Sequence, residues 1–75
     1  MHSSFKRRFS SDLYHARYKR GLTQREVAEQ AAISIRSYRY IESGSALPTV
    51  NTFLRLVRLF ELDANDYVET DVAVS

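Results

Sequence analysis

The sequence predicts a compact all-α domain of five helices. The chain has 75 residues, which is enough for one domain with a small core. Its two glycines and one proline are too few for the many turns of an all-β fold. Apolar residues make up 44% of the chain and recur at helical spacing, so we expect a folded domain rather than a disordered chain.

The composition also excludes several classes of protein. The chain has no cysteine, which rules out a disulfide scaffold and cysteine-based zinc or thiol chemistry. Its two histidines cannot form a metal site by themselves, so we expect no metal and no cofactor. No apolar run is long enough to cross a membrane, and no apolar segment of a signal peptide follows the basic run Lys6–Arg8. We therefore expect a soluble cytoplasmic protein that does not bind membranes.

Charge is distributed unevenly along the chain. Residues 1–58 hold all 11 lysines and arginines and only four acids, which gives +7, whereas residues 59–75 hold five acids and no base, which gives −5. A basic body suits a polyanion such as nucleic acid. The alternative is a solvated surface that only keeps a small domain soluble. The acidic end is expected to point away from the polyanion and to be able to face another protein.

The first helix is predicted to begin at Ser10 or Ser11, either of which can cap it, and to run to about Arg20. Gly21 follows as its stop. Residues 1–10 are polar and basic, and we expect them to form an N-terminal arm.

The second helix is predicted to begin at a capping box. In such a box the Thr23 hydroxyl and the Glu26 carboxylate each bond the other residue's backbone N–H. The spacing of Val27, Ala28 and Ala31 places these three side chains inward.

A turn at residues 32–33 leads to a third helix. Ser34 caps this helix, which is expected to end at about Ser43 with Gly44 as its stop. A helical wheel separates an inward arc from an opposite arc that is polar and cationic. The inward arc holds Tyr38, Ile41 and Glu42, and the opposite arc holds Arg36, Tyr40 and Ser43 with Ser37 and Arg39 beside them.

Thr49 caps a predicted fourth helix with an apolar stripe at helical spacing. The stripe consists of Val50, Phe53, Leu54, Val57 and Phe60. Asp63 and Asp66 resemble a further capping box, which opens a short fifth helix through Tyr67. Residues 68–75 form an acidic C-terminal tail whose intrinsic preference is for strand, or which is simply a frayed terminus.

Five short stretches follow one another between residues 21 and 63. They are GLTQREVA at Gly21–Ala28, Ile33–Ser34, IESG at Ile41–Gly44, PTVNTFLRL at Pro48–Leu56 and FELD at Phe60–Asp63. Together they resemble the lambda-repressor/Cro family, also called the XRE type. The resemblance covers about residues 11–67 and implies a lambda-repressor-like domain with a helix-turn-helix motif at about residues 24–43. It also implies sequence-specific binding to double-stranded DNA.

The resemblance places DNA contacts at the start of the second helix and along the third. Gln24 is expected to bond a backbone phosphate, and Arg25 either does the same or is only solvated. Arg36 is expected to donate two hydrogen bonds to a guanine base, one to O6 and one to N7. Ile35 either contacts a thymine methyl group or packs under the turn. The predicted DNA-binding residues are Gln24, Arg25, Ser34, Ile35, Arg36, Ser37, Arg39, Tyr40 and Ser43, of which Arg39 and Tyr40 brace the sugar–phosphate backbone.

Structural roles follow from the same resemblance. Arg17 and Glu42 match an ion pair that bridges the first and third helices, and their spacing places both on inward arcs. Tyr38 replaces the usual aliphatic core residue, so its hydroxyl needs a partner if it is buried. Ala32 and Glu61 stand where the family usually has glycine, and a positive φ there costs a non-glycine residue about 1–2 kcal/mol.

Taken together, these expectations predict that the protein is a homodimeric transcriptional regulator. We expect it to be a repressor that reads a palindromic operator and associates with the nucleoid. Two alternatives stay open: a DNA-binding antitoxin whose C-terminal tail binds a partner protein, and a controller protein of a restriction–modification system. The basic run Lys6–Arg8 either lies along a minor groove or is a mobile tail. An enzyme is not expected, because His15 has no paired nucleophile and the carboxylates do not converge.

Overall fold

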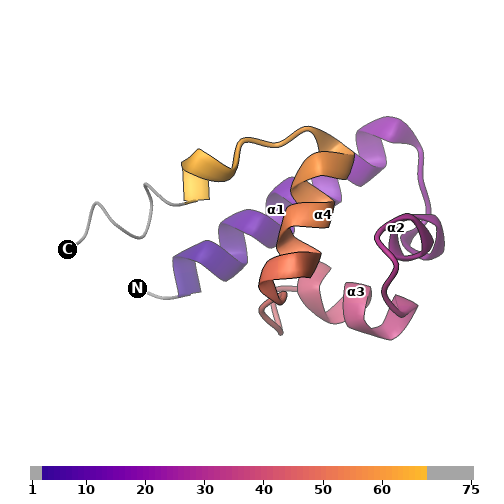
Figure 1. Cartoon of the computed structure of the whole chain (residues 1–75), viewed down its shortest axis with the longest axis horizontal. Helices are drawn as coiled ribbons and strands as arrows, with labels where there is room; N and C mark the ends of the chain where they lie inside the picture. The colour runs from indigo at the N-terminus through magenta and orange to yellow at the C-terminus, as the bar shows by residue number, and fades with distance from the viewer. Residues whose placement is uncertain (1–2, 68–75) are drawn as a thin grey trace.

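Helices joined by turns and loops make up the part of the chain that the structure describes (Figure 1). The computed structural model describes residues 3–67, with side chains from residue 5 onward. The helices are α1 (Ser3–Arg20), α2 (Gln24–Gln30), α3 (Ile35–Glu42) and α4 (Val50–Phe60), and a fifth helical turn follows at residues 64–67. The predicted compact all-α fold is confirmed. The tail predicted at residues 68–75 lies outside the described residues.

Residues 3–10 of the predicted arm form the first half of α1, and the predicted helix start at residues 10–11 is wrong. Phe5 and Phe9 lie one turn apart and stack, with their ring centroids separated by 5.4 Å. Both rings also contact Phe53 of α4 and Tyr67 of the final turn, at centroid distances of 5.1–5.8 Å. Burial of these rings outweighs the polar and basic composition of the segment.

The core lies where α1 contacts both α3 and α4 and where α2 packs on α3 (Figure 1). Leu13, Val27, Tyr38 and Leu56, one from each helix, are all 0% exposed. The other buried apolar residues are Phe9, Ala28, Ala31, Ile41, Phe60 and Tyr67. The inward positions predicted for α2 are therefore confirmed. Burial of each large apolar side chain in this core contributes roughly 1.5–3 kcal/mol to the free energy of folding.

The side of α4 that faces the core differs from the predicted stripe. Val50 and Leu54 are 74% and 51% exposed, whereas Leu56 is 0% and Thr52 is 8% exposed. The prediction that Val50 and Leu54 face the core is wrong, because apolar residues occupy most of the circumference of α4 and packing selects among them. Thr52 can enter the core because its hydroxyl is bonded to that of Thr49 at 3.1 Å. The rest of the stripe, Phe53, Val57 and Phe60, is buried or packs against the core as predicted.

Two turns hold non-glycine residues in the left-handed conformation. Ala32, between α2 and α3, has a φ of 60°, and Glu61, after α4, has a φ of 56°. The backbone N–H of Ile33 bonds the carbonyl of Ala28 at 3.0 Å and closes the end of α2. Both positions that the sequence marks as departures from glycine therefore carry strain of about 1–2 kcal/mol.

The final helical turn is attached to α1. The Asp63 carboxylate accepts a hydrogen bond from the backbone N–H of Asn65 at 3.0 Å, so Asp63 caps the turn. The Tyr67 hydroxyl donates a hydrogen bond of 2.6 Å to Asp12 of α1. Burial raises the pKa of Tyr67, and the bond to Asp12 raises it further.

Candidate nucleic-acid interface

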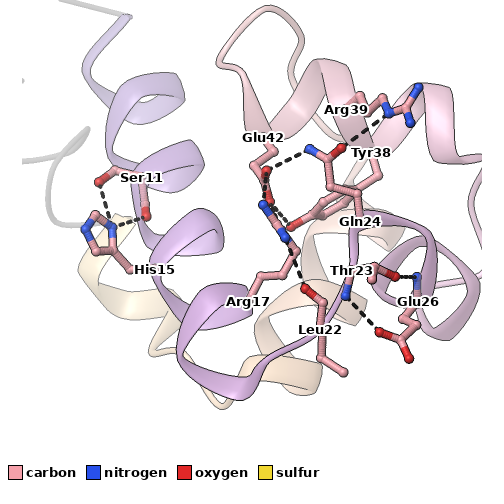
Figure 2. Close-up of polar contacts among 10 residues, drawn as sticks. All are labelled: Ser11, His15, Arg17, Leu22, Thr23, Gln24, Glu26, Tyr38, Arg39 and Glu42. Carbon is pink, nitrogen blue, oxygen red and sulfur yellow. Dashed lines mark hydrogen bonds and ion pairs between the residues drawn. The ribbon is translucent and has the colours of Figure 1, made fainter.

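α2 and α3 are two short helices joined by a tight turn over residues 31–34. α2 begins with a complete capping box: the Thr23 hydroxyl accepts from the Glu26 N–H at 3.0 Å, and the Glu26 carboxylate accepts from the Thr23 N–H at 2.8 Å (Figure 2). The Ser34 hydroxyl accepts from the Ser37 N–H at 3.0 Å and caps α3. The predicted caps of both helices are confirmed. This arrangement is a helix-turn-helix.

α3 has a buried face and an exposed face, as the helical wheel predicts. Tyr38 is 0% and Ile41 is 6% exposed, and these two side chains fix the rotation of the helix. Ile35 is half-buried and packs against the core. The exposed face consists of Arg36, Ser37, Arg39, Tyr40 and Ser43. A polar and cationic surface therefore points outward along the whole of α3.

The predicted DNA-binding side chains differ in whether they already form hydrogen bonds within the protein. Ser34 and Ser37 bond each other through their hydroxyls at 3.0 Å, and the Ser43 hydroxyl donates to a backbone carbonyl of α3 at 3.0 Å. In contrast, the exposed Arg25 and Arg36 make no hydrogen bond or ion pair with any residue that the structure describes. Their guanidinium groups keep all five donors for an external acceptor.

An ion pair between Arg17 and Glu42 joins α1 to α3 (Figure 2). The Nε of Arg17 lies 2.7 Å from Oε2 of Glu42, and its Nη2 lies 3.0 Å from Oε1. The Nη1 of Arg17 also donates to the carbonyl of Leu22 at 3.0 Å. The two side chains are only 16% and 7% exposed. The structure thus contains the pair that the sequence resemblance implies, in the bidentate form that is strongest.

The hydroxyl of Tyr38 donates to Oε2 of Glu42 at 2.6 Å, which supplies the partner that burial of Tyr38 requires. Burial raises the pKa of Tyr38, and the bond to Glu42 raises it further. Burial alone would raise the pKa of Glu42, but hydrogen bonds from Arg17, Tyr38 and Gln24 hold it below its ordinary value. Glu42 therefore stays ionised and accepts from donors on three helices.

Gln24 links this buried group to the exposed face of α3. Its Nε2 donates to Oε1 of Glu42 at 2.8 Å, and its Oε1 accepts from the Nε of Arg39 at 3.3 Å (Figure 2). The sequence places Gln24 and Arg39 in one set of DNA-binding residues but gives no sign of their contact, because they belong to different helices. Gln24 is half-buried, and one of its amide hydrogens is directed into the fold.

The Nδ1 of His15 lies 2.8 Å from the carbonyl oxygen of Ser11 on its own helix (Figure 2). Between residues 5 and 67, no three histidine or acidic side chains are grouped so that they could hold a metal ion. Among the helices described here, none combines the length and the apolar character that a membrane span requires.

Two capped helices, a tight turn and an outward-facing cationic second helix define a helix-turn-helix DNA-binding protein. Residues 11–70 match the family described as "Helix-turn-helix domain". The chain belongs to this family. No curated protein and no solved structure matches it.

Proposed function

We propose that the protein is a homodimeric transcriptional regulator of the lambda-repressor/Cro (XRE) type that reads a palindromic operator. The exposed face of α3 carries this proposal, because Tyr38 and Ile41 fix the opposite face in the core. A helix with such a face fits the major groove, where each base pair presents a distinct pattern of donors and acceptors. Occupation of an operator on the nucleoid excludes other proteins from it, and the protein acts in this way as a repressor.

Arg36 has the leading role in sequence reading. Its guanidinium group is not engaged by the described part of the fold and can fork onto guanine O6 and N7. Ser37 lies beside it on the same face and extends the base-reading surface, whereas Tyr40 braces the sugar–phosphate backbone. Arg25 and Arg39 bind phosphates, which position the domain without selecting a sequence. The remaining members of the interface, Gln24, Ser34, Ile35 and Ser43, border this surface.

An apolar patch supports the homodimer. Leu47, Val50 and Leu54 are 60%, 74% and 51% exposed, and they lie in the loop after α3 and on the first turns of α4. Exposed apolar groups that gather in one place mark an interaction surface. A second copy docked on this patch, which follows directly on α3, supplies the second reading helix, and dimers of such domains bind half-sites about 34 Å apart.

Selection from a randomised duplex library tests the proposal. The duplexes span about three helical turns, long enough for two half-sites, and the bound pool is sequenced. We expect inverted half-sites at a fixed spacing. The same selection with Leu54→Glu, a change at an exposed position, should return one half-site without a fixed second one. A pool without sequence enrichment would contradict specific binding, and a single half-site for the wild-type protein would contradict the dimer.

A further inference from the structure

We infer that Tyr38, a core residue, positions Arg39 for a phosphate contact. It acts through Glu42 and Gln24, which connect the core to the exposed face of α3 (Figure 2). The inference rests on the proposed DNA binding and adds to it a residue that has no access to DNA, since Tyr38 is 0% exposed.

The first step is the orientation of the Glu42 carboxylate. Its Oε2 accepts from the hydroxyl of Tyr38 at 2.6 Å and from the Nε of Arg17 at 2.7 Å. Arg17 also donates from Nη2 to Oε1 at 3.0 Å, and the Tyr38 hydroxyl, from a different helix, adds a third bond that fixes the rotation of the carboxylate group. Its Oε1 is thereby held 2.8 Å from the amide nitrogen of Gln24.

The second step is the orientation of the Gln24 amide, which has a donor end and an acceptor end. An ionised carboxylate only accepts hydrogen bonds, so Glu42 requires the nitrogen of Gln24 to face it. The amide oxygen must then face the other way, and it accepts from the Nε of Arg39 at 3.3 Å. A flipped amide would place two oxygens together and would turn its own donors toward Arg39.

The third step concerns what Arg39 presents to solvent. Its Nε is held by Gln24, while neither terminal nitrogen has a partner among the described residues. These two nitrogens carry the parallel N–H groups that bind phosphate in a bidentate manner. Because the side chain is oriented before DNA arrives, less rotational freedom is lost when the contact forms.

The test compares two tyrosines that make the same kind of bond. Tyr38 and Tyr67 are both buried, and each hydroxyl donates to a carboxylate at 2.6 Å, but Tyr67 lies on the final turn, at the other end of α1 from α2 (Figure 1). The probe is a fluorescein-labelled duplex of mixed sequence, titrated at several salt concentrations. Tyr38→Phe should weaken binding about five- to tenfold at 0.1 M salt and lower the salt slope by about 0.9, the value of one phosphate contact. Tyr67→Phe should change neither quantity.

Equal salt slopes for the two variants would overturn the inference. Binding of the wild-type protein to the same duplex would at the same time support DNA binding, on which the proposed function rests. A Tyr38→Phe protein that fails to fold where Tyr67→Phe folds would also overturn it, because Tyr38 would then be structural only. A wild-type protein that binds no duplex would overturn both proposals.

A second comparison tests the connection between the half-buried Gln24 and the exposed Arg39. If Gln24 acts by orienting Arg39, the double variant Gln24→Ala/Arg39→Gln should bind the duplex no more weakly than Arg39→Gln alone. Independent losses that multiply in the double variant would show separate phosphate contacts and would overturn the connection.

Discussion

Glu42 receives one hydrogen bond from Arg17 on each of its carboxylate oxygens, and this pair joins α3 to α1. α3 has only eight residues, which is too few for a helix to be stable in isolation. Its orientation therefore depends on tertiary contacts such as this pair. Water screens the attraction weakly, because both side chains are largely buried.

Replacing Glu42 with alanine should destabilise the domain strongly. The change leaves Arg17 without its counter-charge and Tyr38 without its acceptor, and losing one partner of such a pair costs about 3–5 kcal/mol. At about 4–8 °C per kcal/mol, the Tm should fall by more than about 10 °C in a circular dichroism melt. Glu29→Ala, at an exposed position of α2, is the control and should change the Tm only slightly. An unchanged Tm for Glu42→Ala would exclude a stabilising role for the pair.

The same contacts predict a loss of stability in acid. The pKa of Glu42 is lower in the folded state than in the unfolded chain, so the unfolded state takes up a proton first as the pH falls. The stabilising contribution of Glu42 is full above the ordinary glutamate pKa of about 4.3 and is lost as the pH falls through the lower folded-state pKa. In urea unfolding between about pH 6 and about pH 3, the wild-type protein should lose more stability than Glu42→Gln. Equal losses would contradict this assignment.

Glycine at the turn between α2 and α3 should stabilise the protein. Ala32 has a φ of 60°, and Ala32→Gly should relieve about 1 kcal/mol of strain and raise the Tm by several degrees. Gly21 provides the matched reverse change, because it has a φ of 67° and an added Cβ would meet no atom within 4 Å. Gly21→Ala should therefore lower the Tm by a similar amount. Shifts of the same sign in the two variants would show that left-handed strain does not control either turn.

Arg36 and Arg25 should differ in the kind of binding that they supply. Arg36→Ala should lose about 1–3 kcal/mol of discrimination at one base pair of the selected operator and bind its single-base variants nearly alike. Arg25→Ala should weaken binding to all sequences by the same factor and reduce the salt slope by about one. The measurement is a titration of each protein against the operator and its single-base variants. A uniform loss for Arg36→Ala would assign it to a phosphate.

Local sequence rules predict the caps and the turns well, because each depends on residues a few positions apart. Thr23 with Glu26 and Ser34 with Ser37 belong to this class. The positive φ at Ala32 follows instead from the family resemblance, which usually has glycine there. The bond from Tyr38 to Glu42 also spans one helical turn, so the i, i+4 spacing of a buried hydroxyl and a carboxylate could have revealed it.

Features that depend on contacts distant in the chain could not be predicted. The first half of α1 is helical because Phe5 and Phe9 meet Phe53 and Tyr67, which no local pattern indicates. Periodicity could not choose the buried side of α4, because apolar residues occur on most of its sides. The contact of Gln24 with the Arg17–Glu42 pair likewise exists only once three helices are packed together.

The aromatic cluster has a consequence for how the chain folds during synthesis. Its first ring belongs to Phe5 and its last to Tyr67, which bonds Asp12. A growing chain leaves the ribosome from its N-terminus, so the rings of α1 emerge long before their partners. Until Phe53 and Tyr67 have emerged, Phe5 and Phe9 lack the rings that cover them, and exposed apolar surface of this kind favours aggregation. Completion of the cluster removes this surface from water.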